Sequence, residues 1–573
     1  MIKRYTLPYS IIISLILVAS TLSQGTVAGK TGQRPVGTAT VAKPVSGESI
    51  ESDVGEALAI IEANHVSGRK LDYNIVVKSS IDGMLHSLDP HSNYFDAKEF
   101  EQFRTDQRSL YEGIGATIGD LIDPEGNVLA TYIRATFEGA PAHRAGLRYG
   151  DKIVEVNGTN VLGKSYVDVR NLLRGPRGTA AKLLIERYGT GKREIVEIIR
   201  GAVSQPSIQE AYMIRPGIGY IAMTGGFNET TYAEFVDAMR ILKAKGMQQL
   251  VLDLKNNGGG LVREAKNVAN AFLSRGQLIF TQRGRLDGAT EPFYADNNNP
   301  ETMPLVVLVN RNSASASEIL AGALQDHDRA LIVGETSFGK GLVQYPFRLN
   351  YGSMVLMTVA RYETPSGRLI QRDYSDGNLY NYLTNGGVGR DAETTPETNG
   401  ASAKTDGGRT VYSGGGIKPD VAIKADSMTL DQARYQQKLQ NPIFSFALDL
   451  VYGRIPGHEA FRADRPIKFA YDINEKDFAI SDSLYASLRE YAVKKYKYTP
   501  AQVDKERKFI ETALRAELVT AAYGMTSSLQ VYNERDTQLQ KAIDLLPQAK
   551  QLALDSARNK AAAANRQRNA NER

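Results

Sequence analysis

A serine-rich segment at a predicted strand-to-helix turn is the first place in this sequence where chemistry is expected. Asn312 to Glu318 reads N-S-A-S-A-S-E, follows the apolar run Leu305 to Asn310 and precedes the helical run Ile319 to Leu324. A serine at such a turn is held exposed, with the free amides of the helix start directed at whatever it attacks. Ser315 is therefore a candidate nucleophile. The alternative is an ordinary helix start, because Ser315-x-x-Glu318 is also a capping box.

The serine needs a base, and the sequence offers a histidine and a lysine. His327 follows Ser315 by twelve residues, so the helix rise of about 1.5 Å per residue carries it well away from the hydroxyl. We predict that it is a surface residue at the helix end. Lys340, in the glycine turn Gly334 to Gly341, can act as a base only if burial makes it neutral by lowering its pKa by roughly 3 units. A solvated lysine in an exposed turn is the alternative.

A third segment, Leu252 to Leu261, is an apolar strand that ends in three glycines before a predicted helix from Val262 to Leu273. Bare backbone amides at such a turn can form half of an oxyanion hole, with the amide of Ala316 supplying the other half. A tight strand-to-helix connection is the alternative.

Two glycine-rich segments are similar to nucleotide-binding loops, and both depart from the pattern. Gly334 to Lys340 fits G-x-x-x-x-G-K, but Gly341 stands where the magnesium-binding hydroxyl should be. Gly113 to Gly119 misses the dinucleotide fingerprint by one residue and is followed by strands. Nucleotide binding is therefore an unfavoured alternative.

The alternation of apolar strands and helical stretches predicts a multidomain α/β protein. Short β-rich runs with one helix, Ser165 to Leu173, predict a small β-barrel or sandwich. Further on, strand runs alternate with helices and predict a largely parallel sheet whose last strand is Met354 to Val359. The expected parts are a signal peptide at 1–25, a linker at 26–51, a helical N-terminal domain at 52–107, the β-rich domain at 108–203, the α/β domain at 204–425 with a polar loop at 372–413, and a helical C-terminal region at 426–573 with a disordered tail.

Composition and the N-terminus restrict the class of protein. A net charge of +5 over 573 residues is too small for a nucleic-acid-binding protein. Lys3 and Arg4, followed by the apolar run Tyr9 to Ala19, predict an export signal, with an uncleaved membrane anchor as the alternative. The absence of cysteine excludes a thiol nucleophile and a disulfide framework, and export without disulfides favours a bacterial periplasm or cell envelope.

Taken together, these segments resemble the carboxyl-terminal processing peptidase family over roughly residues 52–424. The family's S-A-S-A-S-E-I string implies that Ser315 is the nucleophile. Its F-G-K-G-x-V-Q string implies that Lys340 is the base, 25 positions later, and that Gln344 orients it. Three flanking strings agree with the family: Leu88 to Ser92, Thr364 to Arg368 and Gly416 to Asp420.

The resemblance also implies an oxyanion loop and a peptide-binding module. Asn256 to Gly260 looks like the family's oxyanion loop, with either Gly259 or Gly260 as the donor beside Ala316. Gly139 to Ile153 resembles the P-A-x-x-A-G-L-x-x-G-D-x-I string of PDZ domains. Such domains hold the terminal carboxylate of a peptide on backbone amides, here implied at Gly113, Ile114, Gly115 and Ala116.

The function implied by the resemblance is that of a serine endopeptidase with a crotonase-like core, which processes or degrades envelope proteins near their C-termini without a metal or cofactor. Protein or peptide substrates are the expected partners. An adaptor or activating protein, peripheral or transient membrane association and the oligomeric state stay open. The insert at 372–413 and the region after 426 depart from the minimal family pattern, so the control of access to the site stays open as well. The alternatives are a catalytically silent PDZ adaptor, which the presence of Ser315, Lys340 and Gln344 disfavours, and a nucleotide-binding enzyme.

Overall fold

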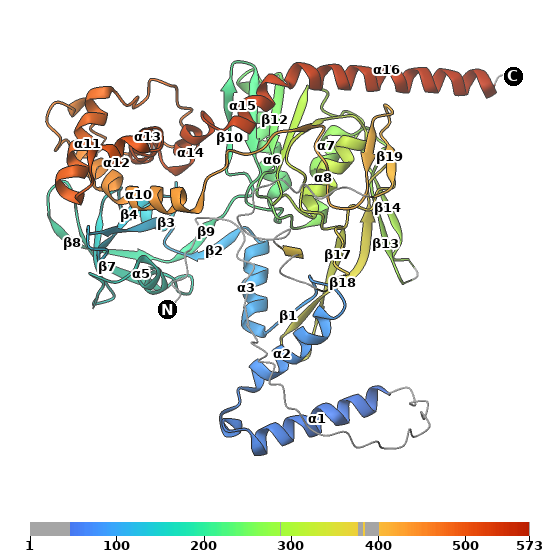
Figure 1. The fold of residues 1–573 in the computed structure, drawn as a ribbon, viewed down its shortest axis with the longest axis horizontal. Helices are drawn as coiled ribbons and strands as arrows, with labels where there is room; N and C mark the ends of the chain where they lie inside the picture. Colours follow the sequence, from blue (N-terminus) through green and yellow to red (C-terminus); the bar gives the residue numbers. More distant parts are fainter. Residues whose placement is uncertain are drawn as a thin grey trace, which may run out of the picture. The chain divides into compact units, whose positions relative to one another are not determined.

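The computed structural model describes residues 46–286, 288–375, 377, 382–383, 400–463 and 465–571, and Figure 1 shows the course of the chain. The expected signal peptide and most of the expected linker lie outside the described residues. The chain divides into a smaller unit, 1–97 with 346–357, and a larger unit, 98–345 with 358–573. Helical parts, a β-rich part and a core of strands alternating with helices confirm the predicted multidomain α/β class.

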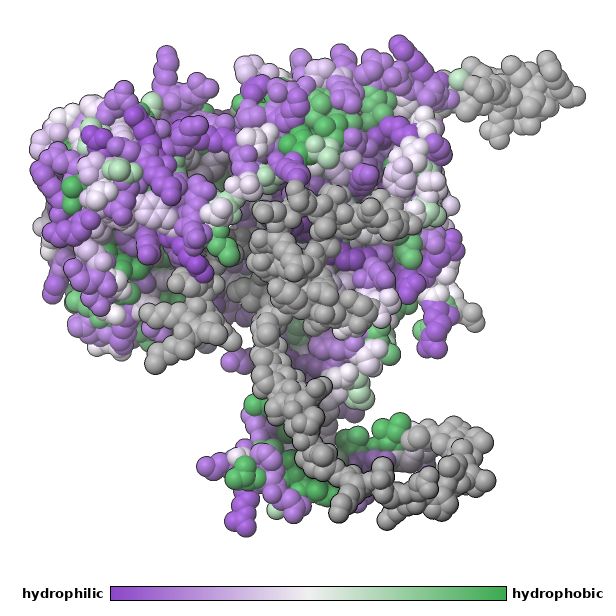
Figure 2. Space-filling view, viewed as in Figure 1, coloured by the Kyte–Doolittle hydropathy of each residue, from purple (hydrophilic) through white to green (hydrophobic). Residues whose placement is uncertain are grey.

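The smaller unit contains two helices that bury few side chains. Its elements are α1 (Gly47–Asn64), η1 (Gly68–Lys70), α2 (Tyr73–His86) and β1 (Asn93–Phe95). β1 pairs antiparallel with the first residues of β18 (Met354–Glu363). Because α1 begins at Gly47, the last residues of the expected linker are helical. Figure 2 shows apolar side chains on the surface of this unit, and its exposed apolar residues include Ile50, Val54, Ile61, Ile75 and Met84.

The β-rich domain of the larger unit is an antiparallel sheet packed against a short helix. The strands run in the order β3-β4-β5-β7-β8, with β6 beside β5, and β2 pairs separately with β9. Its buried core includes Ile133, Ile153, Val169 and Leu183. β3 lies at one edge of the sheet. The elements, preceded by α3 (Ala97–Gln107), are β2 (Leu110–Gly113), β3 (Ala116–Ile122), β4 (Val128–Thr136), α4 (Pro141–Arg144), β5 (Lys152–Val156), β6 (Thr159–Asn160), α5 (Tyr166–Leu173), β7 (Ala180–Glu186), β8 (Arg193–Ile199) and β9 (Gly201–Ser204).

The α/β core has a sheet with the strand order β10-β11-β12-β15-β16-β21, in which every pair after β10–β11 is parallel. Its elements are β10 (Glu210–Arg215), β11 (Ile218–Ala222), α6 (Thr231–Ala244), β12 (Gln249–Asp253), α7 (Val262–Phe272), β15 (Leu305–Val309), α8 (Ala316–Asp326), β16 (Leu331–Gly334) and β21 (Val421–Ala422). β12, β15 and β16 are neighbours, so the loops after their carboxyl ends meet at one edge of the sheet. These are the three loops that the sequence singled out.

Helices cover both faces of this sheet, as the strand side chains require. Every residue of β15 is buried, and successive side chains of a strand point to opposite faces. Leu305 and Val307 pack in one apolar cluster with α6, α7 and α8, whereas Val306 and Leu308 pack in another with α15 (Thr537–Asp544) and α16 (Leu546–Asn571). The C-terminal helices are thus part of the core of this domain.

The predicted strand Met354 to Val359 was assigned to the wrong sheet. It is the first part of β18, whose later residues pair antiparallel with β13 (Leu278–Gly284), and β13 also pairs with β14 (Glu291–Tyr294). β17 (Leu342–Arg348) pairs with β18 as well. An apolar strand next in sequence to a parallel sheet does not have to join it, because the following segment, Val421 to Ala422, takes the place beside β16.

The C-terminal region packs on the β-rich domain as well as on the core. Its remaining elements are α10 (Leu430–Val451), η2 (Glu459–Phe461), α11 (Asp482–Tyr496), α12 (Pro500–Lys505), α13 (Arg507–Tyr523) and α14 (Met525–Asn533). One buried cluster joins Leu121 and Tyr132 of the sheet to Phe444 and Leu514 of α10 and α13. Across the described ranges, none of the helices combines the length and the apolar character that crossing a membrane requires.

Two expectations for irregular chain are corrected. The described part of the polar loop at 372–413 contains a hairpin of β19 (Ser402–Lys404) and β20 (Thr410–Tyr412). The expected disordered tail continues α16 as far as Asn571.

Candidate active site

Ser315 lies between β15 and α8, at the carboxyl edge of the parallel sheet. Its backbone has a φ of +56°, which is rare for a residue with a Cβ and costs about 1 to 3 kcal/mol unless the surroundings impose it. The surroundings do so here: the Tyr362 hydroxyl donates to the Ser315 carbonyl at 3.1 Å, and the Ser315 amide donates to Glu318 Oε2 at 2.7 Å. The residue is half-buried and directly precedes the first residue of α8.

Lys340 lies on the loop that follows β16, the neighbouring parallel strand. Its Nζ donates to Gln344 Oε1 at 2.8 Å, so the structure brings together the lysine and the glutamine that the sequence linked. Lys340 as a whole residue is half-buried. Its loop follows the carboxyl end of β16, which lies between β15 and β21 in the sheet.

Glu318 connects the serine loop to the lysine loop. One carboxylate oxygen accepts the amides of Ser315 and Lys340, at 2.7 and 2.9 Å, and the other accepts the Ser337 hydroxyl at 2.5 Å and the Gly339 amide at 2.6 Å. The side chain is fully buried, and this burial raises the pKa of the Glu318 carboxyl. The four hydrogen bonds favour the charged form and lower the pKa, but the effect of burial is larger. The amides of both proposed catalytic residues are thus held on a single oxygen atom.

Sequence reasoning recognised Glu318 only as a helix cap. Every residue of α8 is buried, so the acidic residue in its first turn required internal partners, and that requirement was the available signal.

The glycine loop lies directly against the serine. A Cβ on Gly259 would come within 2.8 Å of Ser315 Cβ and 3.0 Å of the Ala316 nitrogen, so only glycine fits there. Asn257 fixes the loop, because its carbonyl accepts the Ala314 amide at 2.9 Å and its Oδ1 accepts the Gly259 amide at 2.9 Å. Gly260, with a φ of +138°, lies against the Phe227 backbone. Ala316 is the first residue of α8, where amides have no partner within the helix.

His327 is a correction to the sequence prediction. It is buried, not on the surface, and its ring nitrogens lie 2.8 Å from Asp406 Oδ2 and 2.7 Å from the Leu278 carbonyl oxygen. The segment that buries it returns from far along the chain, which the local helix pattern could not show. The ring therefore connects the end of α8 to Asp406 and Leu278.

In the Gly334 to Lys340 loop, backbone amides that a phosphate would need as donors are already hydrogen-bonded within the protein. The amides of Glu335, Phe338, Gly339 and Lys340 donate to Val309, Ser313 and Glu318. A carboxylate occupies the place where a phosphate-binding loop would hold its anion. The geometry weighs against the nucleotide alternative.

The predicted peptide-binding residues lie at the start of edge strand β3. Gly113 ends β2, Ile114 and Gly115 are buried, and Ala116 begins β3. Gly115 has a φ of +73° and its missing Cβ would lie 2.3 Å from Ala140 Cβ, so the turn depends on glycine. Ile118 of β3 packs in the cluster that contains Val169 and Leu173 of α5. The loop, the strand edge and the helix therefore adjoin one another.

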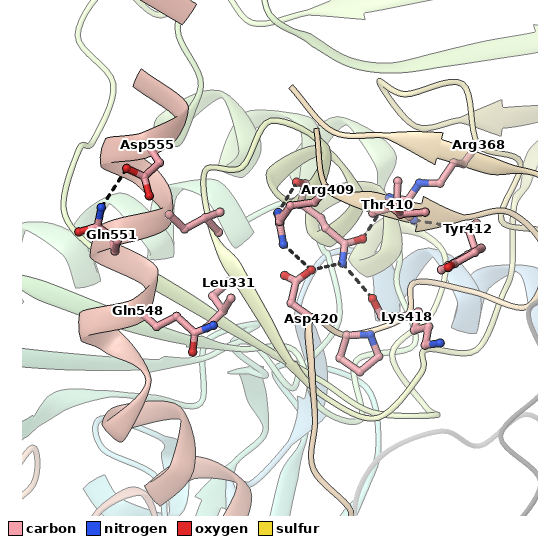
Figure 3. Close-up of a pocket in the computed structure, with 14 residues that line it drawn as sticks. Leu331, Arg368, Arg409, Thr410, Tyr412, Lys418, Asp420, Gln548, Gln551 and Asp555 are labelled. Atoms are coloured by element: carbon pink, nitrogen blue, oxygen red, sulfur yellow. Dashed lines mark hydrogen bonds and ion pairs between the residues drawn. The ribbon is translucent and has the colours of Figure 1, made fainter. Parts of the chain in front are cut away.

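A cavity of about 470 Å³ lies elsewhere, between α16 and the β19–β20 hairpin (Figure 3). Arg368 and Arg409 line one side and Gln551 and Asp555 of α16 the other. Arg409 pairs with Asp420 at 2.5 Å, and Arg368 pairs with Asp326. These protein carboxylates already neutralise the two guanidinium groups, so the cavity does not show an anion site.

Comparison with known proteins agrees with this arrangement. The sequence profile of peptidase family S41 matches residues 217–377, and that of the PDZ domain matches residues 133–187. A carboxy-terminal-processing protease of Bartonella bacilliformis is 36% identical over 301 residues, which cover 52% of this chain and 67% of the relative. The carboxy-terminal processing protease CtpA of Bacillus subtilis is 34% identical over 328 residues, covering 57% and 68%.

Among solved structures, the photosystem II D1 C-terminal processing protease is 28% identical, with 66% of this chain and 94% of that chain covered and a TM-score of 0.33. The two bacterial relatives, each matched over two thirds of its length, and the two domain matches establish the family. The chain belongs to the carboxy-terminal processing proteases of peptidase family S41 and is a serine-type peptidase with a PDZ domain.

Proposed function

We propose that this peptidase cuts protein chains near their carboxyl ends with Ser315 as nucleophile and Lys340 as base. The observation that carries the proposal is the buried Glu318 carboxylate, which binds the amides of both residues beside the glycine loop. A nucleophile and its base must be held within hydrogen-bonding reach during the reaction. One shared oxygen atom restricts the distance between the two loops.

In the proposed reaction, neutral Lys340 takes the proton of the Ser315 hydroxyl as Oγ attacks the scissile carbonyl carbon. The resulting oxyanion is held by the Ala316 amide and by an amide of the glycine loop. Gly260 is the better second donor, because the Gly259 amide is already used by Asn257. The proton then passes to the leaving amine, and a water molecule hydrolyses the acyl-enzyme with Lys340 again as base.

Gln344 has a positioning role in this proposal, since its Oε1 accepts from Nζ and directs the amine. A substrate chain over the half-buried lysine would exclude the remaining water and favour the neutral amine. The loop at Gly113 to Ala116 would hold the terminal carboxylate of the substrate, and the apolar side chains around Ile118 and α5 would contact an apolar terminal side chain.

We further propose that the substrates are envelope proteins and that the enzyme is exported to a bacterial periplasm or envelope. This rests on Lys3, Arg4 and the apolar run after them, and on the absence of cysteine.

The test is cleavage of an unstructured protein that ends in apolar residues, compared with the same protein with an amidated C-terminus. Ser315→Ala and Lys340→Ala should each lose all measurable cleavage, Gln344→Ala should lose most of it, and the exposed-lysine control Lys404→Ala should keep it. Amidation should raise KM. Full cleavage by Ser315→Ala or Lys340→Ala would end the assignment, and peptide binding without turnover by the unmodified protein would favour a silent adaptor instead.

A further inference from the structure

A buried charged cluster outside the proposed catalytic residues joins the C-terminal region to the start of the glycine loop. Lys255, two residues after the end of β12, is 9% exposed and directly precedes Asn256 to Gly260. Its Nζ forms an ion pair with Asp536, which lies 281 residues away in the sequence, and lies 3.6 Å from Asp253 Oδ2. The two ends of this cluster therefore belong to different parts of the fold.

The carboxylate of Asp536 has two tasks. Its Oδ1 accepts the Leu539 amide at 2.9 Å, which caps helix α15, and its Oδ2 contacts Lys255. α15 in turn is fixed to the sheet by Leu539, Ala542 and Ile543, which pack in one cluster with β12 and β15. The position of Asp536 is thus set by the core and not by a mobile surface loop.

The lysine is held charged at this position. Burial opposes the charge of Lys255, but Asp253 and Asp536 outweigh it, so its pKa lies above the ordinary value. The Lys255 amide also donates to Asp253 Oδ1 at 2.8 Å, and the Tyr220 hydroxyl donates to Asp253 Oδ2 at 2.9 Å. The first turn of the loop is therefore held on both its backbone and its side chain.

We propose that Asp536 of the C-terminal region is a positioning residue for catalysis, which sets the start of the oxyanion loop through Lys255. This inference rests on the proposed function and extends it, because it assigns the region after residue 426 a part in the reaction. A glycine-rich loop has little conformational restraint of its own, so an amide that must meet a developing oxyanion needs anchors at the loop ends. Asn257 anchors the middle of the loop and Lys255 its beginning.

The experiment compares Asp536→Asn with Asp544→Asn in the full-length protein. Asparagine is as good a helix N-cap as aspartate, so Asp536→Asn keeps the cap and removes only the charge that faces Lys255. Asp544 is the matched control, because it lies on the same helix and forms an exposed ion pair with Arg215 at 4.0 Å. We expect Asp536→Asn to lower kcat about tenfold with KM changed less than twofold, and Asp544→Asn to change neither.

Two further measurements separate positioning from loss of structure. Amide hydrogen exchange should become faster at Asn256 to Leu261 in Asp536→Asn and stay unchanged in Asp544→Asn. Lys255→Met should lower kcat similarly, and the double variant with Asp536→Asn should be no slower than Lys255→Met alone, because both changes break one contact. An unchanged kcat, or additive losses, would overturn the inference. If the unmodified protein cleaves nothing or Ser315→Ala stays active, the proposed function fails instead, whereas the exchange measurement still tests the contact.

Discussion

Glu318 shows how one buried side chain can fix two loops that follow different strands. Its two oxygens accept four hydrogen bonds, from Ser315, Ser337, Gly339 and Lys340. A carboxylate suits this place because it is an acceptor only, with sites for all four donors. The strained backbone of Ser315 is stable in this setting because the carboxylate holds its amide.

We predict that Glu318→Gln strongly lowers both activity and stability. A glutamine amide offers one oxygen and turns the other acceptor into a donor, so two of the four buried donors lose their partner. The expected cost is about 2 to 4 kcal/mol in the free energy of unfolding, measured by urea titration. Glu335→Gln, in the neighbouring loop, makes the same chemical change without touching these hydrogen bonds and should be nearly neutral. Similar unfolding curves for both variants would contradict the role given to Glu318.

Glu210 gives a prediction about pH. Burial, with Asp253 nearby, raises the pKa of Glu210 from its ordinary value of 4.5 to about 8, while an Asn533 hydrogen bond at 2.7 Å and the charge of Lys255 act in the other direction. Between these two pH values the folded protein keeps a proton that the unfolded chain has released. Stability from this group is therefore lost as the pH rises through that window.

Glu210→Gln removes this titration and keeps the shape of the side chain. The free energy of unfolding of the variant, minus that of the unmodified protein, should therefore increase by about 1 to 3 kcal/mol from pH 5 to pH 8, since one pKa unit corresponds to about 1.4 kcal/mol. The measurement is urea unfolding at several pH values. Parallel pH profiles of the two proteins would show that Glu210 does not hold the proton.

At the scale of elements, the edge strand β3 separates two surfaces through its alternating side chains. Ile118 packs toward α5, whereas the neighbouring Thr117 lies 3.5 Å from the Met525 sulfur of α14. The face of β3 with Ile118 thus lies toward α5, where we propose that the peptide binds, and the face with Thr117 contacts the C-terminal region.

We predict that Ile118→Thr weakens binding of a peptide with an apolar free C-terminus about tenfold, which corresponds to about 1.4 kcal/mol. Threonine keeps the β-branched shape that suits a strand but replaces part of the apolar contact. Thr117→Val, on the opposite face, is the control and should bind as the unmodified protein does. Fluorescence anisotropy with a labelled peptide measures both, and equal affinities would place the peptide elsewhere.

At the scale of the whole molecule, the C-terminal region covers apolar faces of two domains. α10 and α13 pack on the PDZ sheet, and α15 and α16 pack on the parallel sheet. Tyr452 strengthens the first contact, because its hydroxyl donates to the Tyr149 carbonyl at 2.6 Å. The region is therefore part of the folded core of the enzyme.

We predict that a chain ending at Lys424 is not a stable, soluble protein. Loss of the C-terminal region would expose the apolar faces that the buried residues of α10, α13 and α15 now cover, and exposed apolar patches of that kind promote aggregation.

A single change in α15 tests the same contact. Ile543→Asp should lower the melting temperature by at least about 5 °C because it buries a charge. A monodisperse truncated chain with the melting temperature of the full protein would contradict this view.

The sequence alone determined the order of the motifs, the strands that carry them and the family resemblance, because each depends on residues within a short window. Ser315, Lys340, Gln344 and the glycine loop were all identified in this way. The tertiary structure decided the rest. The shared hydrogen bonds of Glu318, the burial of His327 by Asp406 and the pairing of Lys255 with Asp536 depend on segments far apart in the chain. Which distant segment packs where is set by the burial of whole strand and helix faces, and no local pattern contains that information.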